Sequence, residues 1–267
     1  MWTEHPGFGS LIAATLLAVI AARRHGRHLA CGDAVGEASL SPGGTLVFGE
    51  IHGTREFPAA FGTIACNAAE DGAVVVGLEI SRAEQPRIDA YLASDGGAAA
   101  RTELLRGAHW SSRDGRSSEA MFGLIDKVRT WRAAGASVAL VAFDVDGGWD
   151  DRDEDMTGPL VAARRAHPDA PMVVLVGNYH ARLASKEPRM AAYLARQIAN
   201  VDTFDAAYGK GTAWVCTDRG CGVHDWGEGE DPGPTRITRD VVIDRDGNTV
   251  FHGHLHVGRI TASYPAR

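Results

Sequence analysis

The sequence predicts an α/β fold with a mainly parallel central sheet, helices on both of its faces and an antiparallel C-terminal edge. Short apolar runs alternate with stretches that carry apolar residues at three- and four-residue spacing, as in parallel sheets covered by helices. After Asn200 the sequence is richer in Gly, Asp, Thr and aromatic residues, which favours antiparallel strands. A chain of 267 residues is long enough to bury one large core of this kind.

Four apolar runs are expected as parallel strands, and the amphipathic stretches between them as crossover helices. The strands are expected at residues 45–49, 74–79, 137–143 and 172–177, and the helices at 56–71, 119–134 and 153–167. Further strands are expected at 212–216 and 240–243, with a hairpin turn at 244–248. Residues 31–267 are expected to form a single domain, since no shift in composition marks a boundary.

The composition is that of a soluble globular protein. Hydrophobic residues make up 45% and charged residues 23% of the chain, and the net charge is −7. Lys and Arg are scattered rather than massed, so nucleic acid is not an expected partner. The expected partner is a small-molecule or peptide substrate, and the oligomeric state stays open.

Residues 1–30 contain an apolar run, 11–22, that is too short to span a bilayer comfortably. Its length suits the core of a signal peptide, although Arg23, Arg24 and Arg27 follow the run rather than precede it. A short N-terminal apolar helix is the alternative. We expect export to the periplasm or outside of a bacterium, with no stable membrane span after processing.

Two of the four cysteines, Cys216 and Cys221, flank the turn-forming segment Thr-Asp-Arg-Gly. This spacing predicts a local disulfide, which the oxidising compartment of an exported protein would favour. A zinc knuckle that includes His224, or unpaired thiols, are the alternatives.

Polar side chains follow each of the four predicted parallel strands. The carboxyl ends of parallel strands lie at one edge of a sheet, where α/β enzymes bind their ligands. Clustered carboxylates raise one another's pKa and destabilise a fold unless they are used. The residues expected at this edge are Glu50 and His52, then Glu79, then Asp144, and then Asn178 and His180.

The cluster favours a hydrolase that activates water to cleave an ester or amide. Glu50, His52, Glu79 and His180 are the expected catalytic residues, because imidazoles and carboxylates can form a general base with its orienting partner. The same four residues could bind Zn or Mn, and they are more ligands than a simple base requires, which favours a metal without deciding it. The chain lacks the G-x-S-x-G elbow of serine hydrolases, which favours direct attack by water.

Four further residues are expected to contact the substrate: Arg55, Asp144, Arg152 and Asn178. Arg55 or Asn178 is expected to stabilise the oxyanion. The alternative for Arg55 and Arg152 is a helix-start charge paired with a neighbouring acid. The segment 144–150 is acidic but lacks the full spacing of a calcium loop, so it is expected as an active-site loop.

Three alternating histidines, His252, His254 and His256, would point to one face of a strand. They could bind a metal, or they could belong to a solvated edge strand.

The motif Gly-Glu-Ile-His-Gly-Thr-Arg-Glu-Phe at 49–57 resembles the opening motif of the erythromycin esterase group and of the related ChaN/Tiki (TraB/Tiki-type) haem-uptake superfamily. Later blocks are similar to those of the superfamily and keep their order. The match spans roughly residues 46–183. The later blocks are Glu79, Trp110, Glu119, Trp131-Arg132, Phe143-Asp144, Arg152-Asp153 with Met156, and the Gly-Asn-Tyr-His-Ala segment at 177–181.

The spacing Glu50-Ile51-His52 is tighter by one residue than in the esterases that open macrolides, and is similar to that of the ChaN/Tiki branch. Macrolide specificity is therefore not expected. The resemblance implies either a hydrolase, including metal-dependent peptidase-like enzymes, or a non-catalytic protein that binds haem or metal. In both cases Glu50, His52, Glu79 and His180 match the functional positions of the superfamily.

Overall fold

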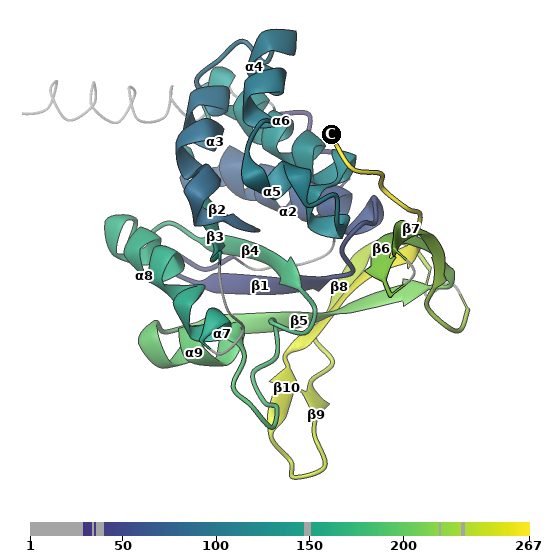
Figure 1. Ribbon diagram of the computed structural model, residues 1–267. Helices are drawn as coiled ribbons and strands as arrows, with labels where there is room; N and C mark the ends of the chain where they lie inside the picture. The colour runs from purple at the N-terminus through teal and green to yellow at the C-terminus, as the bar shows by residue number, and fades with distance from the viewer. Residues whose placement is uncertain (1–28, 34, 36–39, 147–150, 219, 231–232) are drawn as a thin grey trace, which may run out of the picture.

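The computed structural model describes residues 29–33, 35, 40–146, 151–218, 220–230 and 233–267. The expected signal peptide lies almost wholly outside these residues. Within them, seven strands form a sheet in the order β3-β2-β4-β1-β5-β11-β8 (Figure 1). All neighbouring strands are parallel except β8, which pairs antiparallel with β11 at one edge. The predicted fold class is confirmed.

The first four strands lie where the apolar runs predict them, because strands covered on both faces need nearly continuous apolar sequence. Each extends at most two residues beyond its predicted C-terminal end. They are β1 (Thr45–Glu50), β2 (Val74–Ser81), β3 (Val138–Asp144) and β4 (Met172–Gly177).

Helices cover both faces of the sheet (Figure 1). The side chains of β1 alternate between two cores: Leu46 and Phe48 pack with α2 and α6, whereas Val47 packs with α8 and α9. The first face carries α2 (Glu56–Asp71), α3 (Gln85–Leu92), α4 (Ala98–Leu104), α5 (Ala108–Ser111) and α6 (Glu119–Ala133). The second face carries α7 (Arg152–Asp155), α8 (Thr157–Ala166) and α9 (Met190–Gln197).

Local sequence explains where helices begin and break. The Ser118 hydroxyl accepts a hydrogen bond from the Met121 N–H at 3.3 Å and so caps the start of α6. The single helix predicted at 153–167 is wrong in one respect, because it is split at Met156 into α7 and α8. Pro159 has no N–H to donate, so it is tolerated in the first turn of a new helix but would break a continuous one.

The last third of the chain contributes more to the parallel sheet than its composition predicts. β5 (Val201–Gly209) pairs parallel with β1, and β11 (Gly253–Arg259) pairs parallel with β5. Among the strands of the described residues, antiparallel pairing involves β8 (Arg236–Thr238) and two hairpins. The hairpins are β6 (Gly211–Thr217) with β7 (Gly220–Trp226), and β9 (Val242–Ile243) with β10 (Thr249–Phe251), which flank the predicted turn at 244–248.

Two disulfides are present among the described residues. Cys216 is joined to Cys221 across the β6–β7 hairpin, and Cys31 is joined to Cys66 of α2, a pairing that the sequence did not predict. In the described part of the chain, no helix combines the length and apolar character needed to cross a membrane.

Candidate active site

The carboxyl ends of β1, β2, β3 and β4 meet at one edge of the sheet. The chain leaves β1 and β2 for helices on one face, and leaves β3 and β4 for helices on the other (Figure 1). Strands whose connections diverge in this way leave a crevice at their carboxyl ends. The register places Glu50 opposite Gly177 and Ser81 opposite Asp144, so the polar ends of all four strands line this crevice.

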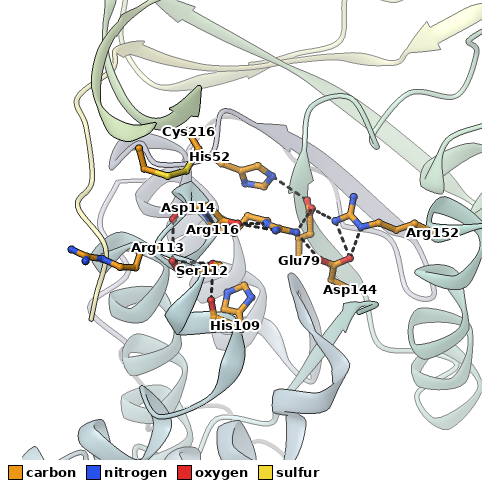
Figure 2. A network of polar contacts seen from close by, with 12 residues as sticks. His52, Glu79, His109, Ser112, Arg113, Asp114, Arg116, Asp144, Arg152 and Cys216 are labelled. Atoms are coloured by element: carbon orange, nitrogen blue, oxygen red, sulfur yellow. Dashed lines mark hydrogen bonds and ion pairs between the residues drawn. A yellow bond between two sulfur atoms is a disulfide. The ribbon is translucent and has the colours of Figure 1, made fainter. Parts of the chain in front are cut away.

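His52 lies between two buried carboxylates. Its Nδ1 atom is 2.9 Å from Glu50 Oε1, and its Nε2 atom is 3.3 Å from Glu79 Oε2 (Figure 2). Glu50 and Glu79 are 3% and 2% exposed, whereas the His52 side chain keeps 27% exposure. His52 is therefore the member of this trio that a ligand can reach.

The electrostatics of the trio are strongly coupled. Burial lowers the pKa of His52, but the charge of Glu79 and hydrogen bonds to Glu50 and Glu79 outweigh it and raise that pKa to about 10. Burial raises the pKa of Glu79, but the positive charge and the hydrogen bond of His52, and then the charge of Arg152, hold that pKa well below its usual range. In the free protein at neutral pH, His52 is therefore an imidazolium beside an ionised Glu79.

Arg152 balances the remaining carboxylate charge. Its Nη2 atom lies 2.7 Å from Glu79 Oε1, and its Nε atom lies 2.9 Å from Asp144 Oδ1. Arg152 is 8% exposed, and its partners raise its pKa against the effect of burial, hydrogen bonding to Asp144 first among them. Arg152 is therefore a buried partner of the site's carboxylates and not merely a charge at a helix start. Removal of either Asp144 or Arg152 would leave the other buried charge unpaired, which costs about 3–5 kcal/mol.

Arg116 completes the network, and the sequence analysis missed it. Figure 2 shows its side chain between Asp114 and the Glu79–Asp144 pair. Its Nη1 atom is 2.9 Å from Asp144 Oδ2, and its Nε and Nη2 atoms are 3.2 and 2.8 Å from Asp114 Oδ2. Each terminal nitrogen of a guanidinium carries two hydrogens, so Nη1 and Nη2 each retain one for a ligand.

His180 is close to the trio but is fully engaged. Its Nε2 atom is 2.8 Å from Arg152 Nη1, and its Nδ1 atom is 2.6 Å from Asp153 Oδ1. Because Arg can only donate, Nε2 accepts and the ring hydrogen is on Nδ1, which donates to Asp153. His180 therefore orients Arg152. Its two ring nitrogens are not available to act as a base.

This arrangement does not fit the metal site that the sequence favours. Within the described residues, no group of three or more His, Cys, Asp or Glu side chains is arranged to hold a metal ion. Glu79 Oε1, Asp144 Oδ1 and His180 Nε2 are all bonded to the Arg152 guanidinium, which provides positive charge where a divalent ion would.

Two predicted substrate-binding residues lie outside the trio's reach. Arg55 is exposed at the start of α2, and its Nε atom donates to the carbonyl of Ala262 at 3.0 Å. Asn178 directs its Oδ1 atom to the Ala206 N–H at 3.2 Å and hydrogen bonds to Asp205, so its amide is committed to β5. Neither is placed to stabilise an oxyanion at His52.

The histidines near the C-terminus form a separate group. His254 and His256 share one face of β11, with ring centres 5.7 Å apart, and His252 accepts a hydrogen bond from the Thr203 N–H at 3.1 Å. The expectation of an edge strand is wrong, because β11 lies between β5 and β8.

Backbone hydrogen bonds of Gly53 fix the position of the loop that carries His52. Gly53 donates its N–H to the Gly115 carbonyl at 3.0 Å, and its own carbonyl accepts from Trp214 and Ser263 at 2.9 and 2.8 Å. Its φ of +73° suits glycine, and a Cβ here would lie 2.0 Å from the Trp214 carbonyl oxygen. The sequence motif after Glu50 therefore has a structural reason, which is to hold His52 against β6 and the Arg116 turn.

Comparison with known proteins supports the fold. Neither a protein-family profile nor a curated protein matches the sequence. Among solved structures, a succinoglycan biosynthesis protein aligns at a TM-score of 0.66 with 7% identity, over 94% of this chain and 99% of its own. A Bacillus cereus protein aligns at 0.62 with 11% identity, over 85% and 91% of the two chains. A mutant of the erythromycin esterase EreC in its open conformation aligns at 0.52 with 14% identity, over 85% and 92%.

The chain has the erythromycin esterase-like fold. This confirms the fold that the sequence resemblance implies, while identities below 15% say nothing about substrate. Of the residues predicted at this edge, Glu50, His52, Glu79, Asp144 and His180 lie in one network of contacts, which Arg152, predicted as a substrate contact, joins. The sequence analysis missed Arg116 and Asp153.

Proposed function

We propose that the protein is a hydrolase that adds water to an ester, with His52 as the residue that transfers the proton. The position of His52 supports this proposal: it is the accessible imidazole of the cluster, and a buried carboxylate faces each of its ring nitrogens. One carboxylate fixes the tautomer and orientation of an imidazole, and the other stabilises the imidazolium that forms.

The proton path follows from the contacts. When His52 is neutral, Nδ1 carries the hydrogen and donates it to Glu50, so Nε2, which lies beside Glu79, has a lone pair that can accept a proton. Nε2 takes a proton from water as the water oxygen bonds to the acyl carbon. The imidazolium formed pairs with Glu79, and then returns the proton to the departing alkoxide oxygen. The products are a carboxylic acid and an alcohol.

Arg116 is the residue best placed to stabilise the tetrahedral oxyanion. Its side chain is 30% exposed, and each terminal nitrogen keeps one hydrogen beyond those donated to Asp114 and Asp144, with Glu79 Oε1 at 3.8 Å from Nη1. A fixed donor at this point stabilises charge that develops only in the transition state, which is worth about 3–4 kcal/mol in comparable sites. Arg116 takes the role that the sequence analysis gave to Arg55 or Asn178.

Haem binding remains the alternative function that the sequence resemblance implies. A titration of the protein with haem, read at the Soret band, tests it. Tight binding that depends on crevice residues would support haem binding over hydrolysis.

Replacement of His52 tests the proposal. Wild type, His52→Gln and the control His167→Gln, at an exposed position after α8, are assayed against a panel of carboxylic esters and peptides. We expect ester hydrolysis in the wild type and the control, and a loss of at least about a hundredfold in kcat for His52→Gln. Full activity in His52→Gln would remove the proposal.

A further inference from the structure

A cavity of about 300 Å³ lies beside the catalytic cluster. It is bounded by the ends of β2 and β3, by α5 and by the turn that carries Arg116. Arg116, Asp144 and Arg152 form its wall toward the cluster, and Ser81, His109 and Asp146 are among the residues of its other walls.

His109 is the unusual residue of this cavity. It is 9% exposed, and its Nε2 atom has no hydrogen-bond partner. The imidazole of His109 forms a hydrogen bond with the Arg116 backbone, and this bond raises the pKa of the ring. A bond with this effect is donated by the ring, so the backbone partner is the carbonyl and the donor is Nδ1–H. Glu84 fixes this position, since its Oε1 atom accepts the His109 backbone N–H at 3.1 Å.

The tautomer decides what His109 can bind. Burial, and next the positive charge of Arg116, lower the pKa of His109, so the ring is neutral at neutral pH. With the hydrogen on Nδ1, Nε2 presents a lone pair. A buried acceptor left without a donor destabilises the protein, and a ligand O–H bonded to Nε2 would remove that cost.

The neighbouring hydroxyls also present lone pairs. Ser81 donates its hydrogen to Asp146 Oδ2 at 2.6 Å, and Ser112 donates its hydrogen to the His109 carbonyl at 2.8 Å. Ser81 Oγ already accepts the Ala83 N–H at 3.2 Å, so each oxygen can accept from a ligand through a remaining lone pair but has no hydrogen left to donate. The cavity thus offers lone pairs at His109, Ser81 and Ser112 and N–H donors at Arg116, so it suits a ligand whose groups both donate and accept.

The charges of the lining are balanced. Arg116 and Arg152 are opposed by Asp144 and Asp146, and His109 is neutral. The lining therefore carries no excess of either charge that would select an anion or an ammonium group, whereas each hydroxyl of a ligand can donate to one lone pair and accept from a neighbouring N–H. Hydroxyl groups match the cavity better than carboxylate, phosphate or amine.

We propose that this cavity is a subsite for a polyhydroxylated alcohol, such as a sugar or polyol, and that the substrate is an ester of that alcohol. His109 Nε2 accepts from one ligand hydroxyl, and the Ser81 and Ser112 oxygens accept from others. The proposal rests on the proposed hydrolase function, because it assigns the alcohol side of the ester whose acyl carbon lies at His52. Arg116 borders both parts.

Ligand-observed saturation-transfer NMR tests the subsite without catalysis, with methyl glucoside and glycerol as probes. We expect saturation transfer in the wild type and in His52→Gln, and a loss of affinity of at least about tenfold in His109→Phe. His109→Gln, whose amide oxygen can still accept, should retain more of the binding, and Ser112→Ala serves as a milder second variant if His109→Phe does not fold.

The outcomes separate the two proposals. The subsite proposal would be overturned if the wild type does not bind the probes, or if His109→Phe and Ser112→Ala bind them as tightly as the wild type does. Either result would count even if His52→Gln abolishes ester hydrolysis. Binding that depends on His109 in a protein that hydrolyses no ester would leave the subsite standing and remove the hydrolase.

Discussion

Gly177, at the end of β4, leaves the space in which the His52 imidazole lies. A Cβ at this position would be 2.6 Å from His52 Nε2 and 3.3 Å from Glu79 Oε2. We expect Gly177→Ala to displace the imidazole from Glu79 and to reduce kcat by at least about tenfold, because catalytic geometry tolerates little displacement. Steady-state ester hydrolysis measures the effect.

Gly123→Ala is the matched control for Gly177→Ala. A Cβ at Gly123, within α6, meets nothing within 4 Å, so this variant should keep full activity and gain up to about 1 kcal/mol of stability. Equal activity of the two variants would show that the space beside Gly177 is not needed for catalysis.

At the residue level, the sequence predicts those site residues that directly follow parallel strands. Glu50, Glu79 and Asp144 lie at the carboxyl ends of β1, β2 and β3, so reasoning from the ends of parallel strands finds them. Arg116 comes from the long connection between β2 and β3, where no periodic pattern places it. Charge balance was the available signal, because three buried carboxylates at one edge require neighbouring cations.

At the level of elements, burial on both faces makes β1 to β4 recognisable, but the same signal fails for β5. Asp202 and Asp205 interrupt its apolar pattern, although β5 lies inside the sheet beside β1. Tertiary pairing overrides local sequence here. The same holds for β11, whose alternating histidines favoured an exposed edge.

The two disulfides differ in the elements that they tie. Cys31–Cys66 joins the segment before β1 to α2 with a sequence separation of 35, whereas Cys216–Cys221 closes a hairpin with a separation of 5. Loop entropy predicts about 4 kcal/mol for the longer loop and less for the shorter one. We expect the double replacement Cys31→Ser/Cys66→Ser to lower the midpoint of urea unfolding more than Cys216→Ser/Cys221→Ser does.

Thiol titration of protein taken from its native compartment shows whether both disulfides are formed before their removal is compared. Four oxidised cysteines would agree with export from the cytoplasm, which we propose from the N-terminal apolar run and the disulfides. If removal of the hairpin disulfide destabilised the protein as much as removal of the longer loop, the loop-entropy account would fail.

At the level of the whole molecule, the carboxylates of the cluster are paired with arginines, and their oxygens are not left open to coordinate a metal. Arg152 and Arg116 carry the positive charge at Glu79 and Asp144. We therefore expect ester hydrolysis to survive EDTA and o-phenanthroline, and elemental analysis to find less than stoichiometric zinc or manganese. Loss of activity on chelation, restored by one of these metals, would show that the side chains rearrange to bind it.

The pH dependence of kcat/KM tests the central claim most directly, since it reports the pKa of the essential base in the free enzyme. Because neutral His52 is the reactive form and its pKa is raised to about 10, kcat/KM should rise with pH and reach half its maximum near pH 10. Glu50→Gln removes a carboxylate that raises this pKa, so its midpoint should lie at lower pH, with folding checked by circular dichroism throughout. A rate independent of pH between about 7 and 11, or an unchanged midpoint in Glu50→Gln, would contradict proton transfer by His52.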